Sequence, residues 1–186
     1  RWVTPTYAYN GELLAQMNQR DSTIFDLYRI PLNGSGARLV ETNTGNITNW
    51  MRSPDGKVRV ALSNDSVESI LWYRAEEYMP YSNIVQTDYG TSIYPFGAIG
   101  DSKNRVFALS NRGRDKQAIV KLDLQTGDEE VITHDPNADL NFEGYHAVKK
   151  DLIFSTSYSS KKITKIHDDK LAALYMKICN EFVGKN

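Results

Sequence analysis

The sequence has one cysteine, no long apolar run and almost no excess of charge of either sign. The single Cys179 excludes an internal disulfide framework. It fits either a reducing compartment or a secreted bacterial protein without bridges, so a cytoplasmic and a periplasmic location both stay open. The 22 Lys and Arg residues against 23 Asp and Glu residues give a formal net charge of -1. Nucleic-acid binding needs a clustered basic excess and a membrane span needs about 20 apolar residues, so the sequence predicts neither partner.

The chain also lacks an initial methionine and an apolar signal region. It begins at Arg1, and we therefore expect either a processed protein or a piece excised from a longer one. Its 186 residues are enough for one domain of ordinary size. The composition, 40% hydrophobic and 24% charged, is close to the average of globular chains.

A repeat of 46 to 47 residues is the main positive signal. Four segments share one pattern, a short run of largely apolar residues followed by small, amide or hydroxyl residues; they span residues 11–21, 57–65, 104–112 and 151–159. Subtracting the numbers of the aligned residues gives spacings of 46, 47 and 47; these residues are Asn18, Asn64, Asn111 and Tyr158. A run that is apolar on both faces is typical of an inner strand between stacked sheets.

Each repeat has the same order of strands and turns. A turn such as Ser53-Pro54-Asp55-Gly56 precedes the apolar strand, because Pro sets φ at the second turn position and Gly accepts a positive φ. Third strands are predicted at 24–32, 67–74, 117–124 and 162–167, and fourth strands at 38–42 and 130–133. Four antiparallel strands per repeat of this length are typical of a β-propeller, whereas the alternative is a β-sandwich with chance echoes. We predict an all-β fold, a partial β-propeller of about four blades over residues 1–167.

Residues 168–186 break the pattern and predict a C-terminal amphipathic helix with a short tail. Apolar residues at spacings of three and four form one helix face; they are Leu171, Leu174, Tyr175, Ile178 and Phe182. Asp168 or Asp169 can cap its start, and Gly184 can end it. Cys179 lies on the apolar side and is predicted to be a small buried hydrophobe. Because an open set of blades leaves sheet faces bare, we expect the isolated chain to self-associate or to cover one end with this helix.

Three motifs in the second half of the chain are more specific. They read Ala-Leu-Ser-Asn-Arg-Gly-Arg-Asp-Lys at 108–116, Lys-Leu-Asp-Leu-Gln-Thr-Gly at 121–127 and His-Asp-Pro-Asn-Ala-Asp at 134–139. This region, residues 106–169, resembles the propeller of the prolyl oligopeptidase family of serine peptidases, in particular its bacterial dipeptidyl-aminopeptidase and acylaminoacyl-peptidase branch. The resemblance implies a propeller of seven or eight blades over an α/β-hydrolase domain with a Ser-Asp-His triad. It also implies that the propeller restricts entry to small peptides and contacts the substrate at a few points.

The sequence departs from that family in lacking the nucleophile. An α/β-hydrolase exposes its serine on a Gly-x-Ser-x-Gly elbow, and no such pentapeptide occurs here. The nearest match, Gly34-Ser35-Gly36, lies in a polar hairpin. We therefore expect no catalytic residue in this chain and a non-catalytic propeller portion whose partner is the α/β-hydrolase domain of the same parent chain. The alternative is a stand-alone propeller module that recognises a protein or peptide.

The hairpin at 111–116 holds the only candidate substrate contacts, Arg112 and Arg114. Read as structure, it is a polar turn in which Gly113 supplies a positive φ and Asp115 offsets the arginines. Read as function, the two guanidinium groups point to a peptide carboxylate, which arginine binds in bidentate geometry. The sequence leaves both interpretations open.

Two other groups of residues were weighed as sites. The histidines His134, His146 and His167 lack the close spacing of metal ligands, so neither a metal nor a cofactor is predicted. The pair Glu76-Glu77 is similar to the acids with which dipeptidyl peptidases hold a substrate's free amino terminus. Its surroundings differ from that motif, and we expect solvated acids in the loop between a third and a fourth strand.

Overall fold

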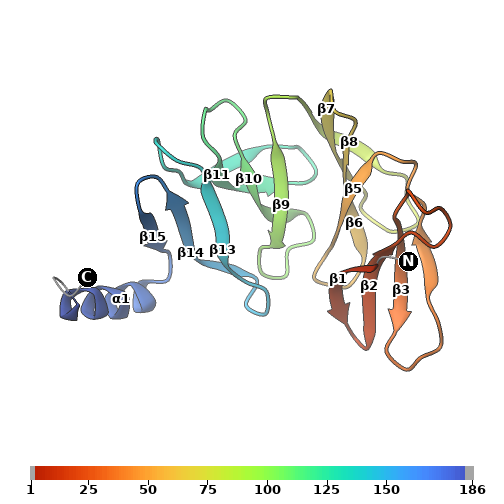
Figure 1. The fold of residues 1–186 in the computed structure, drawn as a ribbon, viewed down its shortest axis with the longest axis horizontal. Coiled ribbons are helices and arrows are strands. Elements are labelled where there is room, and N and C mark those ends of the chain that lie inside the picture. The colour runs from red at the N-terminus through yellow and green to blue at the C-terminus, as the bar shows by residue number, and fades with distance from the viewer. Residues whose placement is uncertain (1–2, 183–186) are drawn as a thin grey trace. The chain divides into compact units, whose positions relative to one another are not determined.

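Four antiparallel sheets follow one another along the chain, and one helix comes after the last of them (Figure 1). The computed structural model describes residues 3–182. The first two sheets consist of β1 (Val3–Tyr9), β2 (Glu12–Met17), β3 (Asp26–Pro31), β4 (Arg38–Glu41), and of β5 (Ile47–Arg52), β6 (Val58–Asn64), β7 (Glu68–Tyr73), β8 (Ser82–Asp88). The third and fourth consist of β9 (Ile93–Ala98), β10 (Arg105–Ser110), β11 (Ala118–Asp123), β12 (Glu129–Thr133), and of β13 (Leu140–His146), β14 (Asp151–Tyr158), β15 (Lys162–Ile166). The helix α1 spans Asp169–Glu181.

Within each sheet, every strand pairs with its neighbour in the sequence. The orders are β1-β2-β3-β4, β5-β6-β7-β8, β9-β10-β11-β12 and β13-β14-β15. The predicted all-β fold, with four successive sets of antiparallel strands and a C-terminal helix, is confirmed. The ends of the predicted third and fourth strands lie within two residues of the observed ones. The inner strand β10 carries five buried residues in succession, as its apolar pattern predicts.

The chain divides into two compact units, one up to Tyr89 and one from Gly90 onward. Each unit contains two sheets and a hydrophobic core of its own. The core of the first unit is formed by Leu14, Leu27, Trp50, Val58 and Ala61. The core of the second is formed by Phe96, Phe107, Leu109, Ile119, Leu140 and Leu152. The division of the chain between residues 167 and 168 stays a prediction.

Tyr145 fixes how the fourth sheet packs on the third. Its hydroxyl donates a hydrogen bond to the carbonyl oxygen of Ala98 (3.1 Å), and its ring meets Phe96 and Phe107 edge-on. The ring fills the space above Gly97, where a Cβ atom would lie 2.3 Å from the ring carbon Cζ. A glycine is therefore required at position 97 for the two sheets to approach this closely.

The helix α1 begins as predicted but packs differently. The Asp168 carboxylate caps it by accepting from the backbone N–H groups of Lys170 and Leu171, both at 3.0 Å. Gly184, expected to end the helix, lies outside the described residues. No residue of α1 is buried, so the predicted burial of Cys179 is wrong, and this thiol is exposed. The reason is that, within the second unit, α1 runs away from the sheet that precedes it (Figure 1), so its apolar face does not cover that sheet.

The described helix is also too short and too polar to cross a lipid bilayer.

Candidate functional site

A dense group of charged side chains lies in the first unit, where the first two sheets meet. Five basic and five acidic residues contribute, and we call them the charged cluster; they are Arg29, Arg38, Lys57, Arg59 and Arg74 with Glu12, Glu41, Asp55, Glu76 and Glu77. They come from β2, β3, β4, β6 and the segments that flank β6 and β7. The charges of the two signs are equal in number. The ion pairs Arg29–Glu77 and Arg74–Glu41 join the first sheet to the second.

Arg29 on β3 connects the first sheet to the second. One of its terminal nitrogens, Nη2, lies 2.6 Å from Oε1 of Glu77 and 3.2 Å from the carbonyl oxygen of Gly56. Its other terminal nitrogen, Nη1, lies 3.6 Å from Glu12. Glu77 also accepts a hydrogen bond from the backbone N–H of Val58 (2.7 Å). The loop after β7 is thereby held against β3 and the start of β6.

Arg59 is the wholly buried cation of the cluster. Its Nη2 lies 2.9 Å from Oδ2 of Asp55 and 3.5 Å from Oε1 of Glu76, while Glu76 also accepts from Nζ of Lys57 (2.5 Å). The Nε and Nη1 atoms of Arg59 have no hydrogen-bond partner among the described residues. A buried guanidinium is unfavourable without an opposite charge, so Asp55 and Glu76 keep Arg59 in the folded chain.

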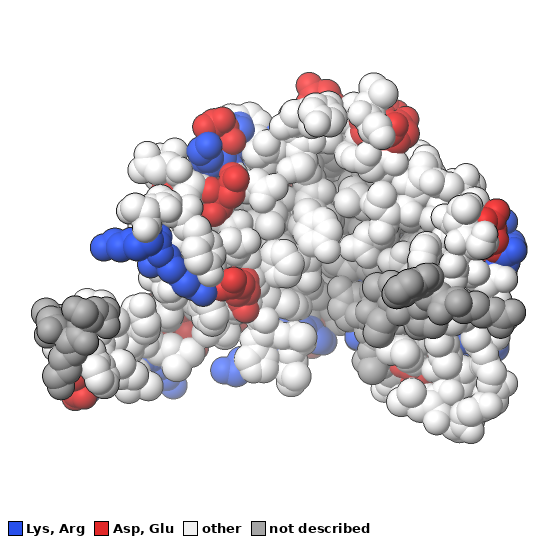
Figure 2. All heavy atoms as spheres, in the orientation of Figure 1, with Lys and Arg blue, Asp and Glu red and all other residues white. Residues whose placement is uncertain are grey.

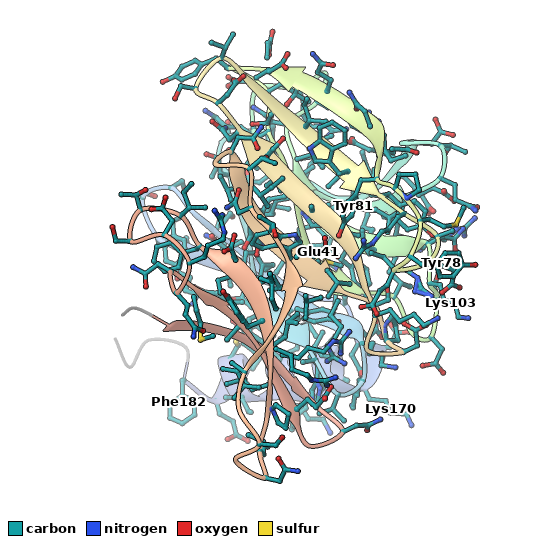
Figure 3. All side chains as sticks on the ribbon, turned by 90° about the vertical axis from the view of Figure 1, so that its right-hand side faces the viewer. Glu41, Tyr78, Tyr81, Lys103, Lys170 and Phe182 are labelled. Carbon is teal, nitrogen blue, oxygen red and sulfur yellow. The ribbon has the colours of Figure 1, made fainter. Side chains whose placement is uncertain are left out.

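Arg74, Glu41 and Tyr81 form the other side of the cluster. Arg74 pairs with Glu41 of β4, and its guanidinium carbon lies 4.3 Å from the centre of the Tyr81 ring, as a cation–π contact. Glu41 and Tyr81 are labelled in Figure 3. The Tyr81 hydroxyl is buried without a hydrogen-bond partner among the described residues. Burial raises the pKa of this hydroxyl well above its usual range, so Tyr81 stays neutral.

We predicted from the sequence that Glu76 and Glu77 are solvated loop acids, and this prediction is wrong. The two residues do lie in the loop between β7 and β8, a third and a fourth strand. Each carboxylate, however, is paired with cations of the cluster, and each of the two glutamate side chains is only about one third exposed. The cations come from β3, from β6 and from the segment before β6, which lie 17 to 48 residues away in the sequence, so no local pattern could have shown the pairing. With these partners, the negative charges of both acids are compensated within the chain.

The predicted substrate contacts Arg112 and Arg114 are brought together by one acid, Glu129. Nε of Arg112 lies 3.4 Å from Oε1 of Glu129, and Nη2 of Arg114 lies 3.4 Å from its Oε2. The Glu129 side chain is only 5% exposed, and it also accepts from the Ser110 hydroxyl (2.7 Å). Gly113 between the arginines has the predicted positive φ, 71°. Glu129 thus offsets the charge of both arginines, a role that the sequence did not indicate.

The three histidines occupy different environments. Nε2 of His167 lies 2.9 Å from the hydroxyl of Ser155, and burial lowers the pKa of this imidazole, with nearby Lys165 adding to the effect. His146 accepts at Nδ1 from the backbone N–H of Lys149 (3.2 Å). His134 is exposed. In the described part of the chain, no three His, Cys, Asp or Glu side chains are grouped so that they could hold a metal ion.

Two hollows lie on the second unit. One, of about 280 Å³, lies on the third sheet among Arg105, Lys121, Asp123 and Glu130. The other, of about 410 Å³, lies on the fourth sheet among Gly144, Tyr145, Val148 and Phe154. Neither is lined by Arg112 or Arg114. On the face drawn in Figure 2, basic and acidic side chains form small groups of both signs, without the continuous basic stripe that nucleic acid requires.

The sequence and the fold were compared with those of known proteins. No family model matches the chain. The chain is 25% identical over 139 residues to dipeptidyl aminopeptidase BIII of Pseudoxanthomonas mexicana, which corresponds to 70% of this chain and 19% of that protein. The chain thus spans about a fifth of this curated relative.

Solved structures share the fold at lower identity. A prolyl endopeptidase matches 91% of this chain and 27% of its own, with a TM-score of 0.57 and 15% identity. Puromycin hydrolase matches 84% of this chain and 27% of its own, with a TM-score of 0.54 and 15% identity. An oligogalacturonate lyase in complex with manganese matches 85% and 47%, with a TM-score of 0.52 and 13% identity. Because a lyase and peptide-bond hydrolases appear together, these structures show the fold alone.

The four successive antiparallel sheets, the matched propeller folds and the curated relative agree with the resemblance seen in residues 106–169. The chain has the fold of a β-propeller region and is similar to those of the prolyl oligopeptidase family of peptidases.

Proposed function

We propose that this chain is a non-catalytic propeller portion of a serine peptidase, which admits small peptides to an active site in an α/β-hydrolase domain of the same polypeptide. The observation that carries the proposal is the match of 139 residues to a dipeptidyl aminopeptidase. The sequence has no Gly-x-Ser-x-Gly elbow, so the nucleophile has to come from another part of the polypeptide.

The charged cluster supports a role in controlling access. A filter by size works only when its walls keep their spacing. Arg29 fastens the first sheet to the second at a 2.6 Å contact with Glu77, and Arg74 does so again through Glu41. Bonds of this charge-assisted kind are stronger than neutral ones and fix the geometry of the groups that make them.

Arg112 and Arg114 remain our proposed substrate contacts. Their side chains are 37% and 26% exposed, so both guanidinium groups are partly open to solvent. Glu129 holds both, Arg112 also donates to the carbonyl oxygen of Gly127 (2.6 Å), and Arg114 donates to that of Ser110 (3.0 Å). An arginine positioned by a buried acid loses little side-chain freedom on binding a carboxylate, which favours this role.

The parent polypeptide tests the function. Sequencing its gene beyond the codon for Asn186 is expected to reveal a Gly-x-Ser-x-Gly motif followed by Asp and His. The purified product is expected to cleave a dipeptidyl 4-nitroanilide, to lose that activity with a serine-reactive fluorophosphonate, and to leave a folded protein substrate uncut. An open reading frame that closes shortly after Asn186 contradicts the proposal and favours the stand-alone binding module.

Arg112→Ala in the parent enzyme tests the substrate contact. We expect KM to rise about tenfold for a short peptide with a free C-terminal carboxylate and to stay unchanged for its amide, because only the former offers an anion to the guanidinium. The matched control is Arg105→Ala, which removes a 63% exposed arginine of the same unit that lies outside the charged cluster. Equal effects of Arg112→Ala on the acid and the amide would show that the hairpin has only a structural role.

A further inference from the structure

The third strand of the fourth sheet differs from its counterparts in having one free edge. The strands β3, β7 and β11 each lie between two others, paired on one side with a second strand and on the other with a fourth. The strand β15 pairs with β14 alone, and within residues 3–182 no strand pairs with its other edge. A row of backbone N–H and C=O groups is therefore available along β15.

The third strands of the four sheets differ in how many of their residues are buried. Three of six residues are buried in β3, two of six in β7 and four of six in β11. None of the five residues of β15 is buried, and Ile163 is 44% exposed. The low burial of β15 is the consequence of its unpaired edge, which leaves room for a further strand.

The edge is regular enough to receive another strand. The pairing of β15 with β14 runs without a register shift from Phe154 opposite Ile166 to Tyr158 opposite Lys162. The strand contains no proline. Bulges, prolines and charged side chains, lysine in particular, are the usual means of protecting an edge. Of these, β15 carries only the lysines, whose charge a strand with carboxylates opposite them would compensate.

The charges on this edge indicate which strand fits it. Lys161, Lys162 and Lys165 are all exposed. Glu143 of the same sheet pairs with Lys162 at 2.8 Å. Lys161 and Lys165 have no carboxylate partner within residues 3–182, and Lys165 donates to the neutral hydroxyl of Thr133 (3.0 Å). A second copy of β15 would bring lysines near one another, which is unfavourable across strands. The third sheet shows the favourable case, because Lys121 of the third strand β11 lies 3.8 Å from Glu130 of the fourth strand β12.

We propose that β15 is a strand-accepting edge that takes an extended acidic segment of the parent polypeptide as the fourth strand of its sheet. Backbone hydrogen bonds along Lys162–Ile166 supply the affinity, and carboxylates opposite the lysines supply the selectivity. The source of the strand rests on the proposed function, which requires a longer polypeptide; the accepting edge does not.

A synthetic peptide with the sequence of residues 127–134 serves as the probe, because it contains β12, the fourth strand of the third sheet. Added to the 186-residue chain, it is expected to slow hydrogen exchange of the β15 amides at least tenfold and to leave exchange in α1 unchanged. The same peptide methylated at alternate backbone nitrogens is expected not to bind, since it keeps the side chains and loses the hydrogen bonds. Lys165→Glu is expected to weaken binding about fivefold, the scale of a cross-strand charge pair.

Equal binding of the methylated peptide, or protection confined to α1, overturns the accepting edge. In the full parent polypeptide, the β15 amides are expected to be protected already and the peptide not to bind. A β15 that still exchanges freely there, or a dimer of the 186-residue chain with protected β15 amides, overturns the parent segment as the occupant. A bound peptide together with a gene that lacks the serine elbow leaves the edge in place and removes only the proposed peptidase function.

Discussion

Replacing Gly144 with alanine is expected to destabilise the second unit by about 3 kcal/mol, at the upper end of the effects of overpacking. A Cβ atom at this position would lie 2.0 Å from the carbonyl oxygen of Phe154 and 2.6 Å from its ring carbon Cγ. The first of these atoms belongs to the backbone of the neighbouring strand, so a change of rotamer cannot relieve the collision. The strand pair β13–β14 has to separate locally, just where its register already shifts between Asn141 and Tyr145.

The measurement is thermal unfolding by circular dichroism, combined with hydrogen exchange of β13 to β15. Gly90→Ala is the matched control, because nothing lies within 4 Å of its added Cβ and its φ is not in the positive range. We expect Gly90→Ala to change the stability by less than about 0.5 kcal/mol. A Gly144→Ala variant as stable as Gly90→Ala would show that β13 and β14 do not approach each other as described.

The second large effect is expected from the acids around Arg59. The double change Asp55→Asn and Glu76→Gln leaves a wholly buried guanidinium without an opposite charge, and we expect a loss of about 3 kcal/mol. Arg59→Met removes the charge itself and fills a similar volume, so its expected cost is smaller, within about 1 kcal/mol. The order of the two variants, not either value alone, tests the interpretation.

Urea unfolding followed by tryptophan fluorescence reports on this region, because Trp50 packs in the core of the first unit and Trp72 lies against it. If Arg59→Met proves more damaging than the double change, the guanidinium contributes through contacts other than its two carboxylates. Arg38→Ala serves as a surface control, since Arg38 is paired but mostly exposed.

The fold was predictable because its signals are local. The turn at Ser53-Pro54-Asp55-Gly56 carries its own mechanism, and Gly56 has the positive φ, 84°, that the turn requires. The repeat of 46 to 47 residues placed each inner strand, since a strand buried on both faces has to be apolar throughout. The cap at Asp168 followed from the chemistry of the first helical turn.

The side-chain network was not predictable, because its contacts join residues that are distant in the sequence. Arg29 and Glu77 are 48 residues apart, and Glu41 and Arg74 are 33 apart. A single sequence does not reveal which charged residue of one sheet faces which residue of the next. The prediction for Cys179 failed for a related reason: a helical pattern identifies an apolar face, but it does not say whether a partner covers that face.

The order of the strands also bears on how the chain forms. Every described strand pairs only with its immediate neighbours in the sequence, so each sheet closes through short hairpins alone. Pairing between near neighbours lowers the entropy of loop closure and speeds folding. At a synthesis rate of about 5–20 residues per second, a repeat emerges from the ribosome in roughly 2–9 s, far longer than the microseconds in which a hairpin forms. The sheets can therefore assemble one at a time during translation, in the order in which they are made.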